Sequence, residues 1–162
     1  MRNRATKNPK SCHERALGLL AVRPRSRREL ERRLLQAGFE PDEVADVLDR
    51  LERVGLIDDE AFARQVAEHA FGVRRAGARA VADALAAKGV ARSTVEAVLA
   101  EAPNDEESRA VELGTSRAQR MKGVETARAF GRLSSFLMRR GYGPEVARRA
   151  ARRALDLPGS ED

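Results

Sequence analysis

The chain contains 162 residues, of which 42% are hydrophobic, 35% are charged and only 4% are aromatic. Helix-favouring alanine, arginine, leucine and glutamate dominate and β-branched residues are few, so the composition predicts an all-α protein and excludes a sheet protein. Lys and Arg number 31 against 25 Asp and Glu, a net charge of +6, and 27 of these cations are arginine. This balance favours partners that carry phosphates or carboxylates, although an arginine excess also fits a GC-rich genome.

The sequence offers no signal for export, membrane insertion or metal binding. No apolar run approaches the ~20 residues that span a bilayer, and the basic start of the chain has no apolar segment behind it. Cys12 is the only cysteine, in a predicted tail, and the two histidines, His13 and His69, have no partners at ligand spacing. Helix capping explains the pair Asp58-Asp59 better than a metal or acid–base site does. We therefore expect a cytoplasmic protein that is not an enzyme and has no cofactor or metal.

A pattern of apolar residues around a glycine occurs three times along the chain. The second copy follows the first by 51 residues at five positions, and the third copy loses one residue after its glycine. The three copies are Leu30, Leu34, Gly38, Phe39 and Val44; Val81, Leu85, Gly89, Val90 and Val95; and Leu133, Leu137, Gly141, Tyr142 and Val146. Each copy predicts two helices joined at the glycine, because glycine adopts the left-handed conformation that ends a helix.

A further helix is predicted in front of each copy, at about residues 13–22, 59–71 and 105–120. We therefore predict three tandem three-helix repeats that form an elongated, curved array. The predicted parts are a basic tail (1–12), repeats at 13–57, 58–104 and 105–155, and an acidic tail (156–162).

Capping residues support these helix boundaries. Ser26 and Glu29 fit a capping box, in which the hydroxyl accepts from the N3 amide and the carboxylate accepts from the cap amide. Asp58 can cap the helix that opens the second repeat, with Ile57 and Phe62 as a hydrophobic staple. Pro41 and Pro144 fit the first positions of later helices.

Arginine clusters are the candidate binding sites. On the predicted helix 144–155, four arginines fall within an arc of about 140° with no acidic residue interleaved, and alanines face the other way. Two more precede that helix, and the other clusters occupy equivalent loops of the first two repeats. The candidates are Arg148, Arg149, Arg152 and Arg153; Arg139 and Arg140; Arg25, Arg27 and Arg28; and Arg74, Arg75 and Arg79. Because aromatic residues are scarce, any nucleic-acid contact should be to the phosphate backbone rather than to bases. The alternative interpretation is that these arginines form an ordinary solvated surface and bind no partner.

Three segments resemble the RecX family, whose members regulate the RecA recombinase. The first runs from Leu51 through Gly55-Leu56-Ile57-Asp58-Asp59 to Phe62-Ala63. The others are Arg75-Ala76-Gly77 with Leu85, Lys88, Gly89 and Val90, and Phe136-Leu137-x-Arg139-Arg140-Gly141-Tyr142. The resemblance covers about residues 14–155 in the family's order. The chain departs from the family pattern because it is rich in arginine and poor in lysine. It also has alanine at positions where other members carry bulkier residues.

The resemblance implies a fold and a function. The implied fold is again three tandem three-helix units. The implied function is that of a non-enzymatic regulator that binds RecA–DNA filaments along their groove. Such a regulator limits filament extension, ATP hydrolysis, strand exchange and coprotease activity in recombination, DNA repair and the SOS response. The implied partners are the RecA filament and single- or double-stranded DNA through non-specific backbone contacts, with the protein acting as a monomer.

Two other interpretations of the sequence stay open. Residues 26–54 superficially fit a helix-turn-helix transcription regulator. Its recognition helix, residues 41–54, would carry five acidic residues against two basic ones, so phosphates would repel it. The other interpretation is a passive helical scaffold, which is favoured only if the basic clusters reflect genome composition.

Overall fold

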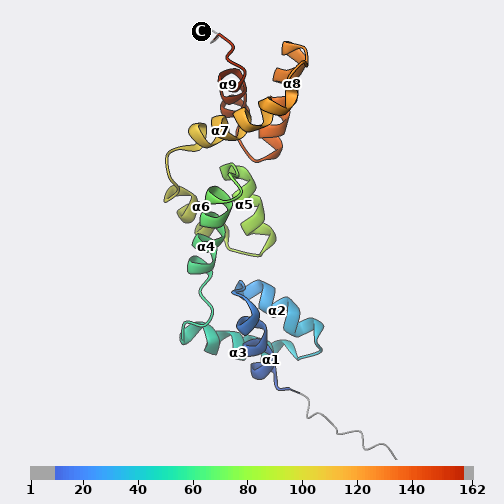
Figure 1. The fold of residues 1–162 in the computed structure, drawn as a ribbon. Helices are drawn as coiled ribbons and strands as arrows, with labels where there is room; N and C mark the ends of the chain where they lie inside the picture. Colours follow the sequence, from blue (N-terminus) through green and yellow to red (C-terminus); the bar gives the residue numbers. More distant parts are fainter. Residues whose placement is uncertain (1–9, 159–162) are drawn as a thin grey trace, which may run out of the picture. The chain divides into compact units, whose positions relative to one another are not determined.

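The computed structural model describes residues 10–158, and every regular element in this part of the chain is a helix (Figure 1). The helices are α1 (Cys12–Val22), α2 (Arg27–Gln36), α3 (Pro41–Arg53), α4 (Asp59–Gly72), α5 (Ala78–Ala87), α6 (Arg92–Ala100), α7 (Glu106–Ala118), the 3₁₀ helix η1 (Gln119–Met121), α8 (Thr126–Arg139) and α9 (Pro144–Ala154). The all-α prediction is confirmed. Most of the predicted basic tail and the last four residues of the acidic tail lie outside the described residues.

Two compact units make up the chain. Within the described residues, the first unit contains residues 10–62 and 88–90, and the second contains residues 63–87 and 91–158. Helices α1–α3, the first predicted repeat, lie in the first unit, and α7–α9, the third, lie in the second. The middle repeat contributes to both units.

The first unit has an aliphatic core formed by α1, α2 and α3. Leu30 and Leu34 of α2 are fully buried against Val44 and Leu51 of α3. Cys12 belongs to this core with 0% exposure, so the prediction that it lies in a tail was wrong. Helix α1 begins at this cysteine, and burial, followed by the nearby Glu43 carboxylate, raises the pKa of its thiol.

A capping box that the sequence analysis overlooked starts α1. The Glu14 amide donates to Ser11 Oγ (3.2 Å), and the Ser11 amide donates to Glu14 Oε2 (2.8 Å). The box predicted at Ser26 is only half present. The Glu29 amide donates to Ser26 Oγ (3.1 Å), but the Glu29 carboxylate binds two guanidinium groups instead of the cap amide. Charge-assisted bonds to arginine are stronger than a bond to one neutral amide.

The predicted helix ends are confirmed at the glycines and prolines. Gly38, Gly89 and Gly141 have φ of 93°, 77° and 93°, the left-handed region in which a side chain is strained. Pro41 and Pro144 stand in the first turns of α3 and α9. These residues set the sharp turns between the second and third helices of the repeats.

Helices α7, α8 and α9 form the core of the second unit. Its largest side chains are Leu133, Leu137 and Tyr142, each at most 1% exposed. Helix α9 meets them with small residues, since Ala147 and Ala151 are fully buried. The predicted alanine face of this helix is thereby confirmed, and its arginines lie on the other side.

Candidate functional site

The first basic loop lies against the turn that follows α5. We call this contact the first joint, formed by residues 25–28 and 88–89. Ser26 Oγ donates to the backbone carbonyl of Lys88. A Cβ added to Gly89 would lie 2.6 Å from Arg28 Cβ, so this arginine packs directly over the glycine. The contact and the positive φ of Gly89 (77°) both disfavour a side chain at this position.

The second basic loop makes the corresponding contact with the turn that follows α8. We call this the second joint, formed by residues 74–79 and 140–142. The Gly77 amide donates to the Arg140 carbonyl (2.9 Å), and the Arg79 amide donates to the Gly141 carbonyl (3.2 Å). Tyr142, only 1% exposed, donates its hydroxyl to the Arg75 carbonyl (2.6 Å), and burial raises its pKa. Two sequence segments that resemble the RecX family therefore bind each other.

At the start of both α2 and α5, the first backbone amide donates a hydrogen bond to an acidic side chain from a later helix. The Arg27 amide donates to Asp59 Oδ1 (2.9 Å), and the Ala78 amide donates to Glu106 Oε1 (3.1 Å). Each carboxylate is the first residue of the helix that opens the following repeat. The amides of a first helical turn lack partners within their own helix, and a carboxylate also suits the positive end of the helix dipole. Asp58 caps α4 as predicted (3.0 Å to the Ala61 amide), whereas the sequence analysis missed the role of Asp59.

The predicted binding arginines at the two joints are only partly exposed. Arg25 is 8% exposed and bound to Glu29, so its side chain belongs to the fold. Arg27 contacts Asp49 and Glu52, both at 2.6 Å. Arg75 pairs with Glu112 (3.1 Å), and Arg140 donates to the Arg74 carbonyl. Among the predicted arginines, those with exposed side chains at or beside the joints are Arg28, Arg74, Arg75, Arg79 and Arg139.

The predicted basic surface of α9 is partly neutralised. Arg149 Nε and Arg153 Nη1 contact the two oxygens of Glu107 at 3.2 and 3.1 Å. Arg152 lies over the Phe130 ring, 5.8 Å from its centroid, while Arg148 is exposed. No acidic residue is interleaved among these arginines on α9 itself, but Glu107 of another helix neutralises two of them. Glu107 lies on α7, and only the packing of α7 against α9 reveals the contact.

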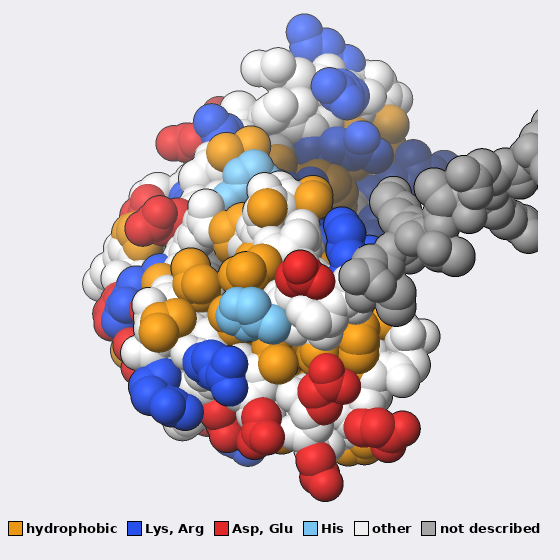
Figure 2. All heavy atoms as spheres, turned by 90° about the horizontal axis from the view of Figure 1, so that it is seen from below, with side chains coloured by type: hydrophobic (Ala, Val, Ile, Leu, Met, Phe, Trp, Pro, Cys, Tyr) orange, Lys and Arg blue, Asp and Glu red, His pale blue; other side chains and the backbone are white. Residues whose placement is uncertain are grey.

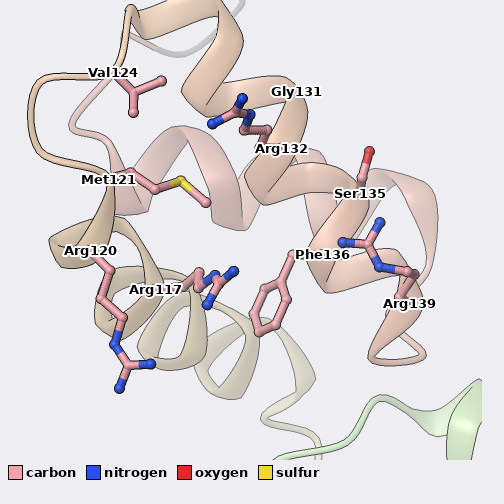
Figure 3. A pocket seen from close by; sticks show the side chains of 9 residues that line it. All are labelled: Arg117, Arg120, Met121, Val124, Gly131, Arg132, Ser135, Phe136 and Arg139. Atoms are coloured by element: carbon pink, nitrogen blue, oxygen red, sulfur yellow. The ribbon is translucent and has the colours of Figure 1, made fainter.

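A basic cavity that the sequence analysis did not find lies in the third repeat. It has a volume of about 660 Å³ and is lined by the end of α7, η1 and α8. Figure 3 shows Arg117 and Arg120 on the side of α7 and η1, and Arg132 and Arg139 on α8. We call it the α7–α8 groove. Only Arg139 was a sequence candidate, because the others lie singly along two helices that are separate in the sequence.

The first repeat presents a surface of mixed character. Figure 2 shows acidic, basic and apolar side chains together on its face. Helix α3 buries Val44, Leu48 and Leu51, and two of its carboxylates pair with Arg27. The other acidic residues of α3, Asp42, Glu43 and Asp46, are exposed, so this side of the helix is acidic. An acidic helix is repelled by the phosphates that line a DNA major groove.

The described residues contain neither a metal site nor a membrane span. No group of three or more His, Cys, Asp or Glu in residues 10–158 could hold a metal ion. Within the same range, no helix is long and apolar enough to cross a bilayer.

Comparison with known proteins identifies the family. Residues 12–51 match the family model of the first three-helix domain of RecX, and residues 58–99 match that of the second. The chain belongs to the RecX family. The regulatory protein RecX of Mycolicibacterium smegmatis is 39% identical over 149 residues, which cover 86% of this chain and 79% of the relative. That of Streptomyces coelicolor is 32% identical over 146 residues, covering 90% and 78%. RecX is thus a family of regulatory proteins, and the resemblance inferred from the motifs is confirmed.

Solved structures of the RecX family share the fold. The crystal structure of RecX from Lactobacillus salivarius matches with a TM-score of 0.80 at 19% identity, over 90% of this chain and 94% of that chain. A crystal structure of another regulatory protein RecX matches with a TM-score of 0.79 at 20% identity, over 86% and 70%. At these identities the likeness shows the fold, and it confirms the helical class predicted from the sequence.

Proposed function

We propose that this protein binds RecA–DNA filaments and restrains RecA, limiting filament extension, ATP hydrolysis, strand exchange and coprotease activity. The observation that carries this proposal is the match of residues 12–51 and 58–99 to two successive RecX domains. In this proposal the protein catalyses no reaction itself and acts as a monomer in the cytoplasm. Its non-specific contacts to single- or double-stranded DNA would run along the phosphate backbone.

The two joints give this proposal a physical basis. Each places an exposed arginine at the same point of a repeat, Arg28 in the first and Arg79 in the second, 51 residues later. A filament is itself a repeating lattice, so equivalent cationic loops can meet equivalent acidic or phosphate groups on successive subunits. Arginine suits either kind of group, because its planar fork binds carboxylate and phosphate with two hydrogen bonds.

The proposal is tested by RecA ATP hydrolysis on single-stranded DNA, titrated with this protein. We expect the rate to fall at substoichiometric protein, since one bound chain can contact several RecA subunits or cap a growing end. An unchanged rate at equimolar protein, together with no binding in a pull-down on immobilised filaments, would contradict the proposal.

The α9 surface provides a second test of filament binding. Replacing Arg148, Arg149, Arg152 and Arg153 by alanine should keep the helix, because alanine is the better helix former. We expect weaker binding to RecA–DNA filaments, and a log affinity–log salt slope that falls by about 0.7 to 0.9 for each phosphate that the arginines no longer neutralise. A control with the same change of charge replaces the exposed residues Arg32, Arg33, Arg50 and Arg53. Equal binding by both variants would show that the α9 arginines make no specific contact with the filament.

A further inference from the structure

The α7–α8 groove carries positive charge that no carboxylate of the groove balances. Four arginines line it, and no acidic residue does. Several exposed arginines elsewhere do pair with carboxylates, as Arg64 does with Glu101 (3.0 Å). The nearby Glu125 is occupied at the start of α8, where its carboxylate accepts from the amides of Ala127 and Arg128. Like charges gathered around one hollow repel each other, so an anion that enters the groove is bound favourably.

The groove also offers apolar surface beside its charges. Met121, Val124 and Phe136 line it together with the arginines. Arg117 lies over the Phe136 ring with its guanidinium carbon 5.2 Å from the centroid, a cation–π contact that fixes this charge at the wall (Figure 3). The ligand that fits is therefore an anion with an apolar part, and not a bare inorganic ion.

We propose that the α7–α8 groove binds single-stranded nucleic acid, with the arginines on successive phosphates and the apolar residues against a sugar or base. A duplex keeps its bases paired inside and would offer the groove little besides phosphates, which would leave the apolar residues uncovered. A carboxylate-rich peptide would pair with the arginines but would leave the apolar wall uncovered. Charged grooves combined with flat or apolar side chains are the usual way in which proteins hold single strands without reading sequence. The inference rests on the DNA contact in the proposed function and does not require RecA.

The test measures the affinity of the full chain for a fluorescent oligodeoxythymidylate, without RecA, by anisotropy at several salt concentrations. The groove variant carries Arg120→Gln, Arg132→Gln and Arg139→Gln, which spares Arg117 and its contact with the ring. The matched control carries Arg32→Gln, Arg50→Gln and Arg53→Gln, three exposed arginines of α2 and α3. Both variants lose the same net charge, so a difference between them reports position and not total charge.

We expect the groove variant to bind at least about tenfold more weakly and its log affinity–log salt slope to fall by about 2, since each single-strand phosphate contact contributes about 0.7. The control should keep its slope. Equal effects of the two variants would overturn the proposal and assign binding to net charge. A groove variant that keeps its oligonucleotide affinity but loses binding to poly-glutamate would also overturn it and would assign the groove to an acidic protein segment.

Two further measurements keep the test decisive. If the triple variant loses its helical circular dichroism, Arg132→Gln alone, an exposed change within α8, should lower the slope by about 0.7. A duplex of mixed sequence should compete poorly with the single strand, and equal competition would overturn the preference for single strands. Because RecA is absent, failure here leaves the ATPase test of the proposed function unaffected.

Discussion

Replacing Gly77 by alanine is expected to lower the free energy of unfolding by about 3 kcal/mol, as overpacking of a closely packed site does. The added Cβ would lie 2.3 Å from both the carbonyl carbon and oxygen of Gly141, and 2.4 Å from the Tyr142 nitrogen. These are backbone atoms, held by the Gly77–Arg140 and Arg79–Gly141 hydrogen bonds, so they cannot move aside as a side chain would. The second joint must open to admit a single methyl group.

Urea denaturation followed by circular dichroism measures this change. The matched control is Gly18→Ala in the middle of α1, where nothing lies within 4 Å of the added Cβ. That change should stabilise the protein by up to about 1 kcal/mol, because alanine favours helix over glycine. If Gly77→Ala unfolds at the same urea concentration as the unchanged protein, the close approach of the two turns is wrong.

Replacing Glu29 by glutamine should also destabilise the protein by about 3 kcal/mol, the lower end of the range for losing one partner of a buried ion pair. Its carboxylate is 7% exposed and binds both Arg25, which is 8% exposed, and Arg23 Nη1 (3.2 Å). The change leaves the buried Arg25 guanidinium without a counter-charge. The control Glu96→Gln removes the exposed pair with Arg92 and should have little effect.

The destabilisation in Glu29→Gln should depend on pH. Burial acts to raise the pKa of Glu29, but hydrogen bonds and charge from Arg23 and Arg25 outweigh it, so the net pKa lies below the ordinary 4.5. As the pH falls, the unfolded chain takes up a proton at this carboxyl before the folded chain does. The stabilising contribution is therefore complete above about pH 4.5 and is lost as the pH falls through the lower, folded pKa. We expect the gap in unfolding free energy between the two proteins to narrow below pH 4.5, and a constant gap would contradict this account of the carboxylate.

Features set by local sequence could be predicted. The turns at Gly38, Gly89 and Gly141 follow from the conformational freedom of glycine, and the alanine face of α9 follows from helical periodicity. The repeat of 51 residues likewise predicts equivalent loops in successive repeats, and this prediction requires no information about their contacts. The helical class and the candidate basic loops therefore came from patterns within one element or between copies of it.

Features set by the meeting of distant segments could not be predicted. Glu107 neutralises two α9 arginines from a helix more than 40 residues away, and nothing in either helix indicates the pair. The Glu29 carboxylate binds two arginines instead of the Ser26 amide, because the loop before α2 brings Arg23 and Arg25 against it. The α7–α8 groove joins Arg117 and Arg120 to arginines of another helix. Spacing along one helix shows a cluster only when its members share that helix.

The hydrogen bond from Ser26 to Lys88 spans 62 residues of the chain and therefore bears on how the protein is made. Ribosomes add about 5 to 20 residues per second, so Lys88 is synthesised about 3 to 12 s after Ser26. A helix such as α2 forms in about a microsecond. During translation the Arg27 amide therefore stays hydrated until Asp59 emerges, and the Ser26 hydroxyl lacks its carbonyl partner until Lys88 emerges. The N-terminal unit matures only after much of the following repeat has left the ribosome, and the nascent chain spends seconds in this open state.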